Sequence, residues 1–269
     1  MHSTDSVNDS GKIAFSSCHP DTGNDLPRRI KSYVRRQSRI TGAQQRALAE
    51  SWGRFGLETG CTVFDPKRAF GRSAPLVLEI GFGDGESLAA MCAANPGIDF
   101  LGIEVHRPGI GHLLLRAVAL GLTNLQVICS DAVEVVERYL PDGCLDRVQI
   151  FFPDPWPKTR HHKRRLIQPS FVALLVRKLK PAGQLHIATD CESYARSILD
   201  TLLVASELEN TAAGNGFAQR PNYRPLTKFE RRGNNLGHNV WEVLFKKRTH
   251  CPMTDHSPPS YAGEIAILL

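Results

Sequence analysis

The feature that most constrains the fold is a regular alternation of short apolar segments with amphipathic ones through the middle of the chain. The apolar segments are rich in Val, Ile and Leu and predict buried strands at residues 76–80, 100–105, 125–129, 147–152, 184–188 and 240–245. Between them, patterns with helical spacing predict helices at 44–52, 86–94, 110–120, 133–139, 169–179 and 192–205. Such alternation is typical of a parallel sheet with helices on both faces.

The last predicted strand differs from the others in what precedes it. Residues 217–232 are basic and proline-containing, and they predict no helix. Because a parallel crossover normally contains a helix, we expect the strand at 240–245 to run antiparallel.

Composition narrows the class of protein. Apolar residues make up 42% of the 269 residues, which supports a buried core, and no apolar run reaches the roughly 18 residues of a membrane span. The first residues, MHSTDSVNDSGK, lack the pattern of a secretory signal. The seven cysteines are scattered and form no CxxC pair, so we expect neither a zinc ribbon nor a redox pair, and we predict a protein of a reducing compartment, the cytoplasm.

A glycine-rich turn follows the first predicted strand. In Leu-Glu-Ile-Gly-Phe-Gly-Asp-Gly-Glu, the strand leads into Gly81, Gly83 and Gly85, and a helix begins directly afterwards. In an open α/β sheet this turn lies at the carboxyl edge, where ligands bind. Glu86 stands where the dinucleotide fingerprint has its third glycine, which disfavours a bound pyrophosphate and therefore a nicotinamide dehydrogenase.

Acidic residues lie within or just after three successive predicted strands. Glu79 adds negative charge beside the turn, Glu104 ends the second strand and Asp131 follows the third. An acid at the place of Glu104 accepts hydrogen bonds from ribose hydroxyls, and Asp131 is placed to accept one from an adenine amino group. A negatively charged pocket without a phosphate cradle suits a cation, so we expect Gly81 and Gly83 to border a site for S-adenosyl-L-methionine, which carries a sulfonium and an amino group.

A proline-rich loop, Phe-Phe-Pro-Asp-Pro-Trp-Pro-Lys, follows the fourth predicted strand at residues 151–158. Its three prolines predict a rigid, irregular path that leaves the same edge of the sheet, so Asp154 is expected to face the glycine turn across a crevice. Trp156 either fills the core or stacks on a base. His161 and His162 are adjacent rather than at helical ligand spacing, so no metal site is expected.

Basic residues are concentrated in three runs. Residues 28–39, 158–165 and 220–232 contain six, five and five Lys or Arg, although the net charge is only +6. One such run is often just a solvated surface, but three favour a polyanionic partner.

Taken together, these segments resemble the bacterial tRNA (guanine-N7-)-methyltransferases. The resemblance extends from Pro27 to Arg248 and rests on the glycine turn, FFPDPWPKTRHHKRRL, IATDCESYAR and RPLTKFERRGNNLGHNVWEVLF. It implies a Rossmann-like class I methyltransferase fold of α/β type, with a seven-stranded, mostly parallel sheet, one antiparallel strand and helices on both faces. The implied reaction moves the methyl group of S-adenosyl-L-methionine to N7 of the variable-loop guanosine (position 46) of tRNA and leaves S-adenosylhomocysteine.

The resemblance also implies roles for individual residues. Donor binding is implied for Glu79, Glu104, Asp131 and Asp154, and Asp154 is also the catalytic candidate. Substrate binding is implied for Lys158, Asp190, Thr227, Lys228, Phe229 and Glu230. Contact with tRNA is implied for Arg160, His161, His162, Lys163, Arg164 and Arg165.

Three residues depart from the family pattern. Cys191 stands where a Trp is usual, Arg196 where an acid is usual and Asn239 where a glycine is usual, and their effect stays open. We expect a single domain at 27–248, preceded by a flexible tail at 1–26 and followed by an extension at 249–269 to which no role is assigned.

Two other functions remain open at this point. A similar proline-rich loop occurs in methyltransferases that act on amino groups of RNA or protein, and an RNA-binding protein could keep the fold without catalysis. The acids at positions 79, 104 and 131 argue against the second. The expected partner is tRNA, with neither a membrane nor a metal, and the sequence leaves a monomer and a homodimer equally open.

Overall fold

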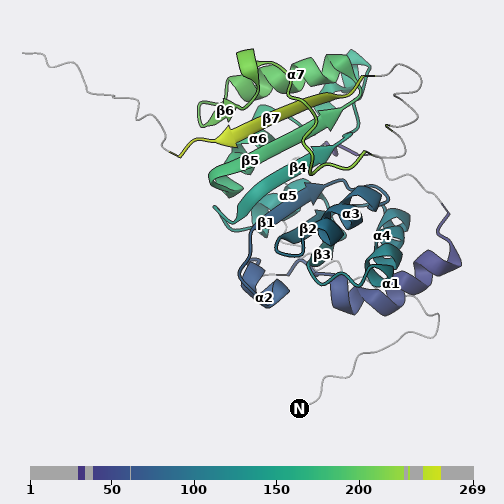
Figure 1. Cartoon of the computed structure of the whole chain (residues 1–269). Helices are drawn as coiled ribbons and strands as arrows, with labels where there is room; N and C mark the ends of the chain where they lie inside the picture. Colours follow the sequence, from purple (N-terminus) through teal and green to yellow (C-terminus); the bar gives the residue numbers. More distant parts are fainter. Residues whose placement is uncertain (1–29, 34–38, 61, 227–229, 231–238, 250–269) are drawn as a thin grey trace, which may run out of the picture.

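The computed structural model describes residues 30–33, 39–60, 62–226, 230 and 239–249 (Figure 1). The predicted tail at 1–26, nearly all of the extension at 249–269, and Thr227, Lys228, Phe229 lie outside these residues.

The described residues form a seven-stranded sheet in the order β3-β2-β1-β4-β5-β7-β6. Its strands are β1 Leu76–Ile80, β2 Asp99–Ile103, β3 Leu125–Ile128, β4 Leu145–Phe151, β5 Leu179–Thr189, β6 Leu208–Asn210 and β7 Trp241–Lys247. Strands β1 to β5 pair in parallel, whereas β7 is antiparallel to both β5 and β6. The predicted antiparallel direction of the last strand is therefore confirmed.

Helices cover both faces of this sheet (Figure 1). They are α1 Gly42–Phe55, α2 Pro66–Phe70, α3 Glu86–Ala94, α4 Arg107–Ala119, α5 Ala132–Arg138, α6 Pro169–Lys178 and α7 Glu192–Leu203, with 3-10 turns η1 Thr159–Arg164 and η2 Ala213–Asn215. No helix in this described part of the chain has the length and apolar character needed to cross a bilayer.

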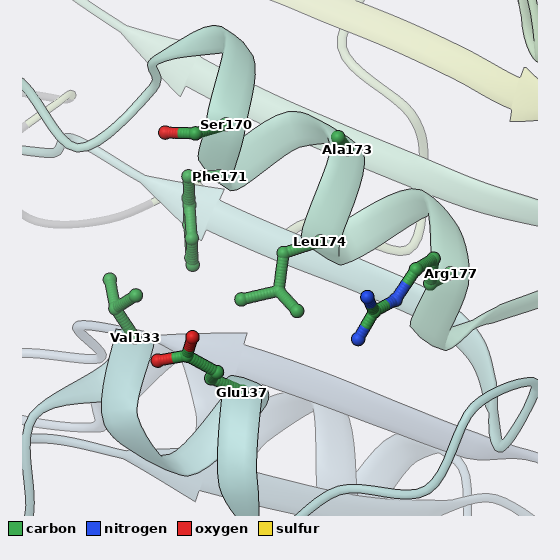
Figure 2. Close-up of a pocket in the computed structure, with 7 residues that line it drawn as sticks. All are labelled: Val133, Glu137, Ser170, Phe171, Ala173, Leu174 and Arg177. Atoms are coloured by element: carbon green, nitrogen blue, oxygen red, sulfur yellow. The ribbon is translucent and has the colours of Figure 1, made fainter.

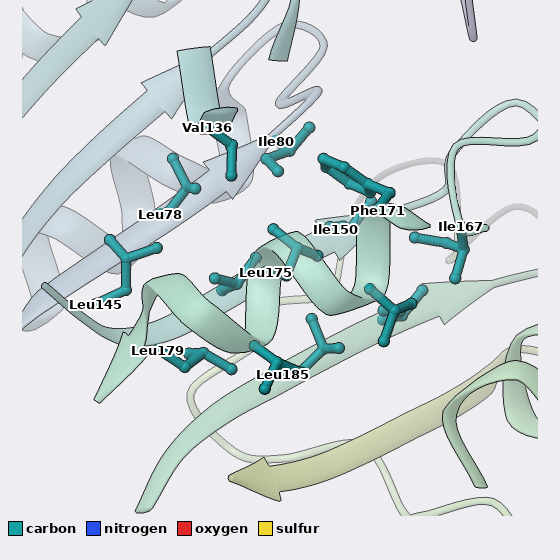
Figure 3. Packing of buried hydrophobic residues seen from close by; sticks show 14 of the residues in the cluster. Leu78, Ile80, Val136, Leu145, Ile150, Ile167, Phe171, Leu175, Leu179 and Leu185 are labelled. Atoms are coloured by element: carbon teal, nitrogen blue, oxygen red, sulfur yellow. The ribbon is translucent and has the colours of Figure 1, made fainter. Parts of the chain in front are cut away.

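Alternating side chains of β1 serve two separate cores. Leu78 and Ile80 pack with α5, α6 and α7 on one face, where Leu175 of α6 lies against the strands (Figure 3). Val77 points to the other face and packs with α1, α3 and α4. Because all five residues of β1 are buried, the strand is held from both sides and its carboxyl end is fixed in place.

Several predicted boundaries were wrong for identifiable reasons. Strand β6 is only three residues long, too short to show a period. Helix α2 was missed although Asp65 caps it and Pro66 occupies its first turn. Strand β5 begins at Leu179 rather than at 184, because Leu179 pairs with Leu145 before the register shifts. Glu230 has helical conformation, although no helix was predicted within 217–232.

Strand order places the candidate site. From β1 the order runs through β2 to β3 in one direction and through β4 to β5 in the other. Loops that leave the carboxyl ends of β1 and β4 therefore diverge to opposite sides and leave a crevice between them, which is where open α/β sheets bind ligands.

Candidate active site

The glycine turn after β1 has the backbone conformation that the sequence predicts. Gly81, Gly83 and Gly85 all have positive φ angles, of 73°, 61° and 73°. At Gly85 a Cβ would lie 2.6 Å from the Cβ of Leu113, so the turn packs directly on α4. At Gly81 and Gly83 a Cβ would meet nothing within 4 Å, so the outer side of the turn borders open space where a ligand can approach the backbone.

Helix α4 supports this turn through a second glycine contact. A Cβ on Gly109 would lie 2.0 Å from the carbonyl oxygen of Gly83, which is far inside any real contact. His112, one turn further along α4, donates from Nδ1 to the carbonyl oxygen of Asp84 over 2.8 Å. The close approach of α4 therefore fixes the position of the turn.

Glu104, directly after β2, is held by the backbone around it. Its Oε2 accepts from the N–H of Gly83 at 2.9 Å, and its Oε1 accepts from the N–H groups of Val105 at 2.7 Å and His106 at 3.0 Å. These bonds orient the carboxylate toward the glycine turn. Asp131, after β3, caps α5 by accepting from the N–H of Val133 at 2.9 Å.

Glu79 lies beneath the turn rather than in the crevice. Its side chain on β1 is 2% exposed and accepts a 2.8 Å hydrogen bond from Gln149 of β4. Burial raises the pKa of Glu79 to about 7 from its ordinary 4.5, and the nearby carboxylate of Glu104 raises it further, whereas Gln149 and Arg147 oppose the rise. Glu79 is therefore half protonated near neutral pH.

The proline-rich loop after β4 is tied down at three points. The N–H of Phe152 donates to Ala188 of β5 at 2.8 Å, and the Nε of Arg165 donates to the carbonyl of Pro155 at 2.9 Å. The indole N–H of Trp156 donates to the carbonyl of Ser32 at 3.0 Å. Phe152 and Trp156 have positive φ angles of 52° and 44°, so the loop is a strained, over-determined turn.

Asp154 is exposed at the tip of this loop. Burial raises the pKa of Tyr194 at the start of α7 to about 12, and the charge of Asp154 is close enough to contribute to that rise. Because β4 pairs with β1, the loop that carries Asp154 leaves the sheet beside the glycine turn. Asp190, exposed directly after β5, lies on the next loop along the same edge.

The basic run at 158–165 forms η1, and its side chains are not equivalent. Lys158, Arg160 and Lys163 are exposed. The guanidinium of Arg164 lies over the ring of Trp156, 4.9 Å from its centroid, so Trp156 is half-buried under a cation instead of filling the core.

Three other side chains of this run are less exposed. Desolvation and the surrounding cations lower the pKa of His161, which with His162 is half-buried. Arg165, for which a tRNA contact is implied by the resemblance, is only 5% exposed and packs on Tyr194, so its burial does not support that role.

A buried polar cluster that sequence reasoning missed lies on the face of β4, β5 and β7. Six of its side chains are Arg147, Gln149, His186, Tyr223, Arg224 and Glu242. Glu230 joins it, with both carboxylate oxygens accepting from Arg224 at 2.8 and 2.6 Å, and is 2% exposed. The available signal was a single titratable residue inside each of two apolar strands, QLHIAT and WEVLF.

A groove of about 350 Å³ lies elsewhere, between α5 and α6 (Figure 2). Glu137, Leu174 and Arg177 are among its lining residues, and none of the predicted site residues lines it. Within the described residues, no group of three or more His, Cys, Asp or Glu is arranged to hold a metal ion.

Comparison with known proteins decides the family. A family model described as "Putative methyltransferase" matches residues 73–243. The tRNA (guanine-N(7)-)-methyltransferase of Alcanivorax borkumensis is 52% identical over 229 residues, which cover 85% of this chain and 95% of that protein. The enzyme of the same name from Halorhodospira halophila is 53% identical over 82% of this chain and 96% of its own length. This chain belongs to the tRNA (guanine-N7-)-methyltransferase family.

Membership in this family identifies the sheet as that of a class I methyltransferase and the chain as a methyltransferase. A solved 16S rRNA (adenine(1408)-N(1))-methyltransferase from Catenulisporales acidiphilia is more distant, with a TM-score of 0.48 and 17% identity over 71% of this chain and 96% of that one. In this family member, Cys191 occupies the N-cap position of α7 without a side-chain capping bond, and Arg196 pairs with Glu192 on the surface of α7 at 2.6 Å. Asn239 is exposed.

Proposed function

We propose that this chain transfers a methyl group from S-adenosyl-L-methionine to N7 of the variable-loop guanosine of tRNA. The observation that supports this most strongly is the division of one sheet edge into two halves around the β1–β4 crevice. Acidic side chains and the glycine turn follow β1, β2 and β3, whereas Asp154 and Asp190 follow β4 and β5. The proposed reaction would take place in the cytoplasm, where a tRNA substrate is available.

The half that follows β1 to β3 has the groups that the donor needs. Gly81 and Gly83 leave open space beside their backbone, and Glu104 keeps acceptor capacity on Oε2, which takes one hydrogen bond from the described residues. A ribose hydroxyl would bind there, and each hydrogen bond to a charged group contributes about 1.5–3 kcal/mol. Asp131 would accept from the adenine amino group, and Glu79, whose pKa is raised to about 7, lies buried below. When bound, the donor supplies an electrophilic methyl group on a sulfonium.

The half that follows β4 and β5 suits a purine. Guanine N7 presents a lone pair and carries no proton, so its methylation requires no strong base. Positive charge develops on the purine as the bond to the methyl group forms and the carbon–sulfur bond breaks. A fixed carboxylate stabilises that charge, and the strained loop holds Asp154 in place before the reaction begins. Exposed Asp154 and Asp190 would accept from the N1–H and amino edge of guanine. Glu230 completes this proposed set, although it is 2% exposed and both of its oxygens accept from Arg224.

The exposed cations are placed to hold the RNA. Lys158 precedes η1, and Arg160 and Lys163 lie within it, immediately after the Asp154 loop in the chain. Phosphate contacts of this kind position the RNA without reading its sequence. They offset the cost of withdrawing a stacked base, which is on the order of a few kcal/mol. Lys158, Thr227, Lys228 and Phe229 complete the proposed substrate-binding set.

The test is a methylation assay with nucleoside analysis. The full chain is incubated with methyl-labelled S-adenosyl-L-methionine and an unmodified tRNA transcript, and the RNA is digested to nucleosides. We expect labelled 7-methylguanosine, and we expect none from a matched transcript that carries adenosine at the variable-loop position.

Two results would overturn the proposal. Label in an N-methylated amino group of a nucleoside would identify an amino-group methyltransferase. Donor binding by calorimetry without any transfer to RNA would identify a protein that keeps the fold and the donor but lacks this reaction.

A further inference from the structure

Arg224 occupies an unusual position in this fold. It is 0% exposed, yet it is a fully charged side chain on the irregular segment between β6 and β7. On this side of the sheet, β4, β5 and β7 carry polar side chains, whereas α1, α3 and α4 pack on β1 to β3. A buried arginine persists only where its donors are satisfied, so its partners indicate what it does.

One end of the Arg224 guanidinium is fixed to the sheet. Its Nε donates to Oε1 of Glu242 on β7 at 3.0 Å, and Nη2 donates to the same oxygen. The other oxygen of Glu242 accepts from Nε2 of His186 on β5 at 2.6 Å. Desolvation lowers the pKa of His186, so the ring is neutral, and its Nδ1 accepts from the hydroxyl of Tyr223 at 2.8 Å. This chain of bonds leaves Arg224 a single orientation.

The other end of the guanidinium holds Glu230. Its Nη1 and Nη2 donate to the two carboxylate oxygens, the paired geometry that arginine makes best. The guanidinium carbon also lies 5.4 Å from the ring centroid of Phe151 and 5.8 Å from that of Phe152, at the start of the Asp154 loop. The guanidinium carbon of Arg147 lies 4.0 Å from the ring centroid of Tyr223. The cluster therefore contains two arginines and two glutamates.

We infer that Arg224 is a positioning residue for the target base: it fixes Glu230 relative to the Asp154 loop, so that both carboxylates are in place before tRNA binds. This inference rests on the proposed function, because it adds the residue that aligns the purine-binding half of the same site. Arg224 acts on the base through Glu230, which it holds beside the root of the loop, and the donor half lies on the other side of the β1–β4 crevice.

A double-mutant cycle tests this role with the full chain. The variants are Arg224→Lys, Glu230→Gln and the double variant, assayed for transfer to the tRNA transcript and for donor Kd by calorimetry. We expect Arg224→Lys to lower kcat/KM for tRNA at least about tenfold while the donor Kd stays within about twofold. We expect the double variant to lose no more than Glu230→Gln alone, because both changes remove the same alignment.

Matched variants separate positioning from folding. Lys178→Met breaks an ion pair of the same 2.6 Å length, to Asp142 at the far edge of the sheet, and is expected to change Tm without changing kcat/KM measured below its melting range. If Arg224→Lys fails to fold, Glu242→Gln is used in its place. This change removes the charged partner that orients Arg224 but leaves the Arg224–Glu230 pair, and we expect the same loss of kcat/KM for tRNA.

The inference would be overturned if the fold-losses of kcat/KM in the two single variants multiplied in the double variant. It would also be overturned if Arg224→Lys or Glu242→Gln kept wild-type kcat/KM for tRNA. Wild-type kinetics in Glu230→Gln would also overturn it, while 7-methylguanosine formation by the unmodified chain would leave the proposed function standing. Failure of the unmodified chain to make 7-methylguanosine would refute the proposed function instead.

Discussion

Replacement of Gly109 by alanine tests whether α4 sets the position of the glycine turn. The new Cβ would lie 2.0 Å from the carbonyl oxygen of Gly83 and 2.9 Å from its carbonyl carbon. Carbon–oxygen contacts normally begin at about 3.3 Å, so α4 and the turn must separate by more than about 1 Å. Both clashing atoms belong to the backbone, so no side-chain rotation relieves the overlap.

The expected magnitude follows from two opposing effects. Alanine favours a helix over glycine by up to about 1 kcal/mol, whereas overpacking of this kind costs up to about 3 kcal/mol. The net loss of about 2 kcal/mol lowers Tm by about 4–8 °C for a chain of this size. The displaced turn also loses the bond from the Gly83 N–H that orients Glu104. Loss of one proposed ribose hydrogen bond to the misplaced carboxylate removes about 1.5–3 kcal/mol of binding free energy, so donor Kd rises at least about tenfold.

The measurements are differential scanning calorimetry and titration with S-adenosyl-L-methionine. The matched control is Gly53→Ala in α1, where a Cβ meets nothing within 4 Å, so the same substitution in a helix is expected to raise Tm slightly and leave donor Kd unchanged. Wild-type Tm and donor Kd in Gly109→Ala would refute the argument that α4 fixes the turn.

Three further predictions concern the two halves of the site. Asp154→Ala is expected to lower kcat at least about 100-fold with tRNA Kd within about twofold, because the carboxylate stabilises charge only as it develops; an equal loss of tRNA binding in a filter assay would contradict this role. Glu79 keeps its proton in the folded state up to pH about 7 but releases it near 4.5 when unfolded, so the free energy of unfolding should fall by about 3 kcal/mol as pH rises between these values. In urea titrations, Glu79→Gln should flatten that fall, and an unchanged pH profile would mean that Glu79 is not titrating there. Replacing exposed Arg160 and Lys163 together by alanine should weaken tRNA binding and reduce its salt dependence, whereas Arg165→Gln should mainly lower Tm because Arg165 is buried; the same salt slope in the double variant would remove η1 from the RNA interface.

The order of strands and helices was predictable because each apolar segment ends in a strong breaker. Residues 76–80 and 86–94 match β1 and α3 without error, since Gly81 and Asn95-Pro96 leave no room for a longer element. The residues after the strand ends were also predictable, because all parallel strands deliver their loops to one edge. Local pattern therefore sufficed to place Glu104 and Asp131 directly after β2 and β3, and their role in donor binding stays a prediction.

The purine half was less predictable because its organisation depends on contacts across the sequence. Arg224 meets Glu242, eighteen positions away, and His186 meets Glu242 from a different strand. Nothing local distinguishes a buried arginine in a basic run from a solvated one, so Arg224 and Arg165 both looked like surface cations. Tertiary packing alone separates them from Arg160 and Lys163.

The place of β7 in the sheet has a consequence for how the protein is made. This strand comes last in the described chain, yet it pairs with β5 near the middle of the sheet and separates it from β6. While the ribosome is still translating residues 241–247, the open edge of β5 exposes unpaired backbone groups, and the carboxylate that balances Arg224 has not arrived. Completion of the purine half is therefore a late event of synthesis. Chains that stop before residue 241 are expected to aggregate or to be degraded, even when their donor half is folded.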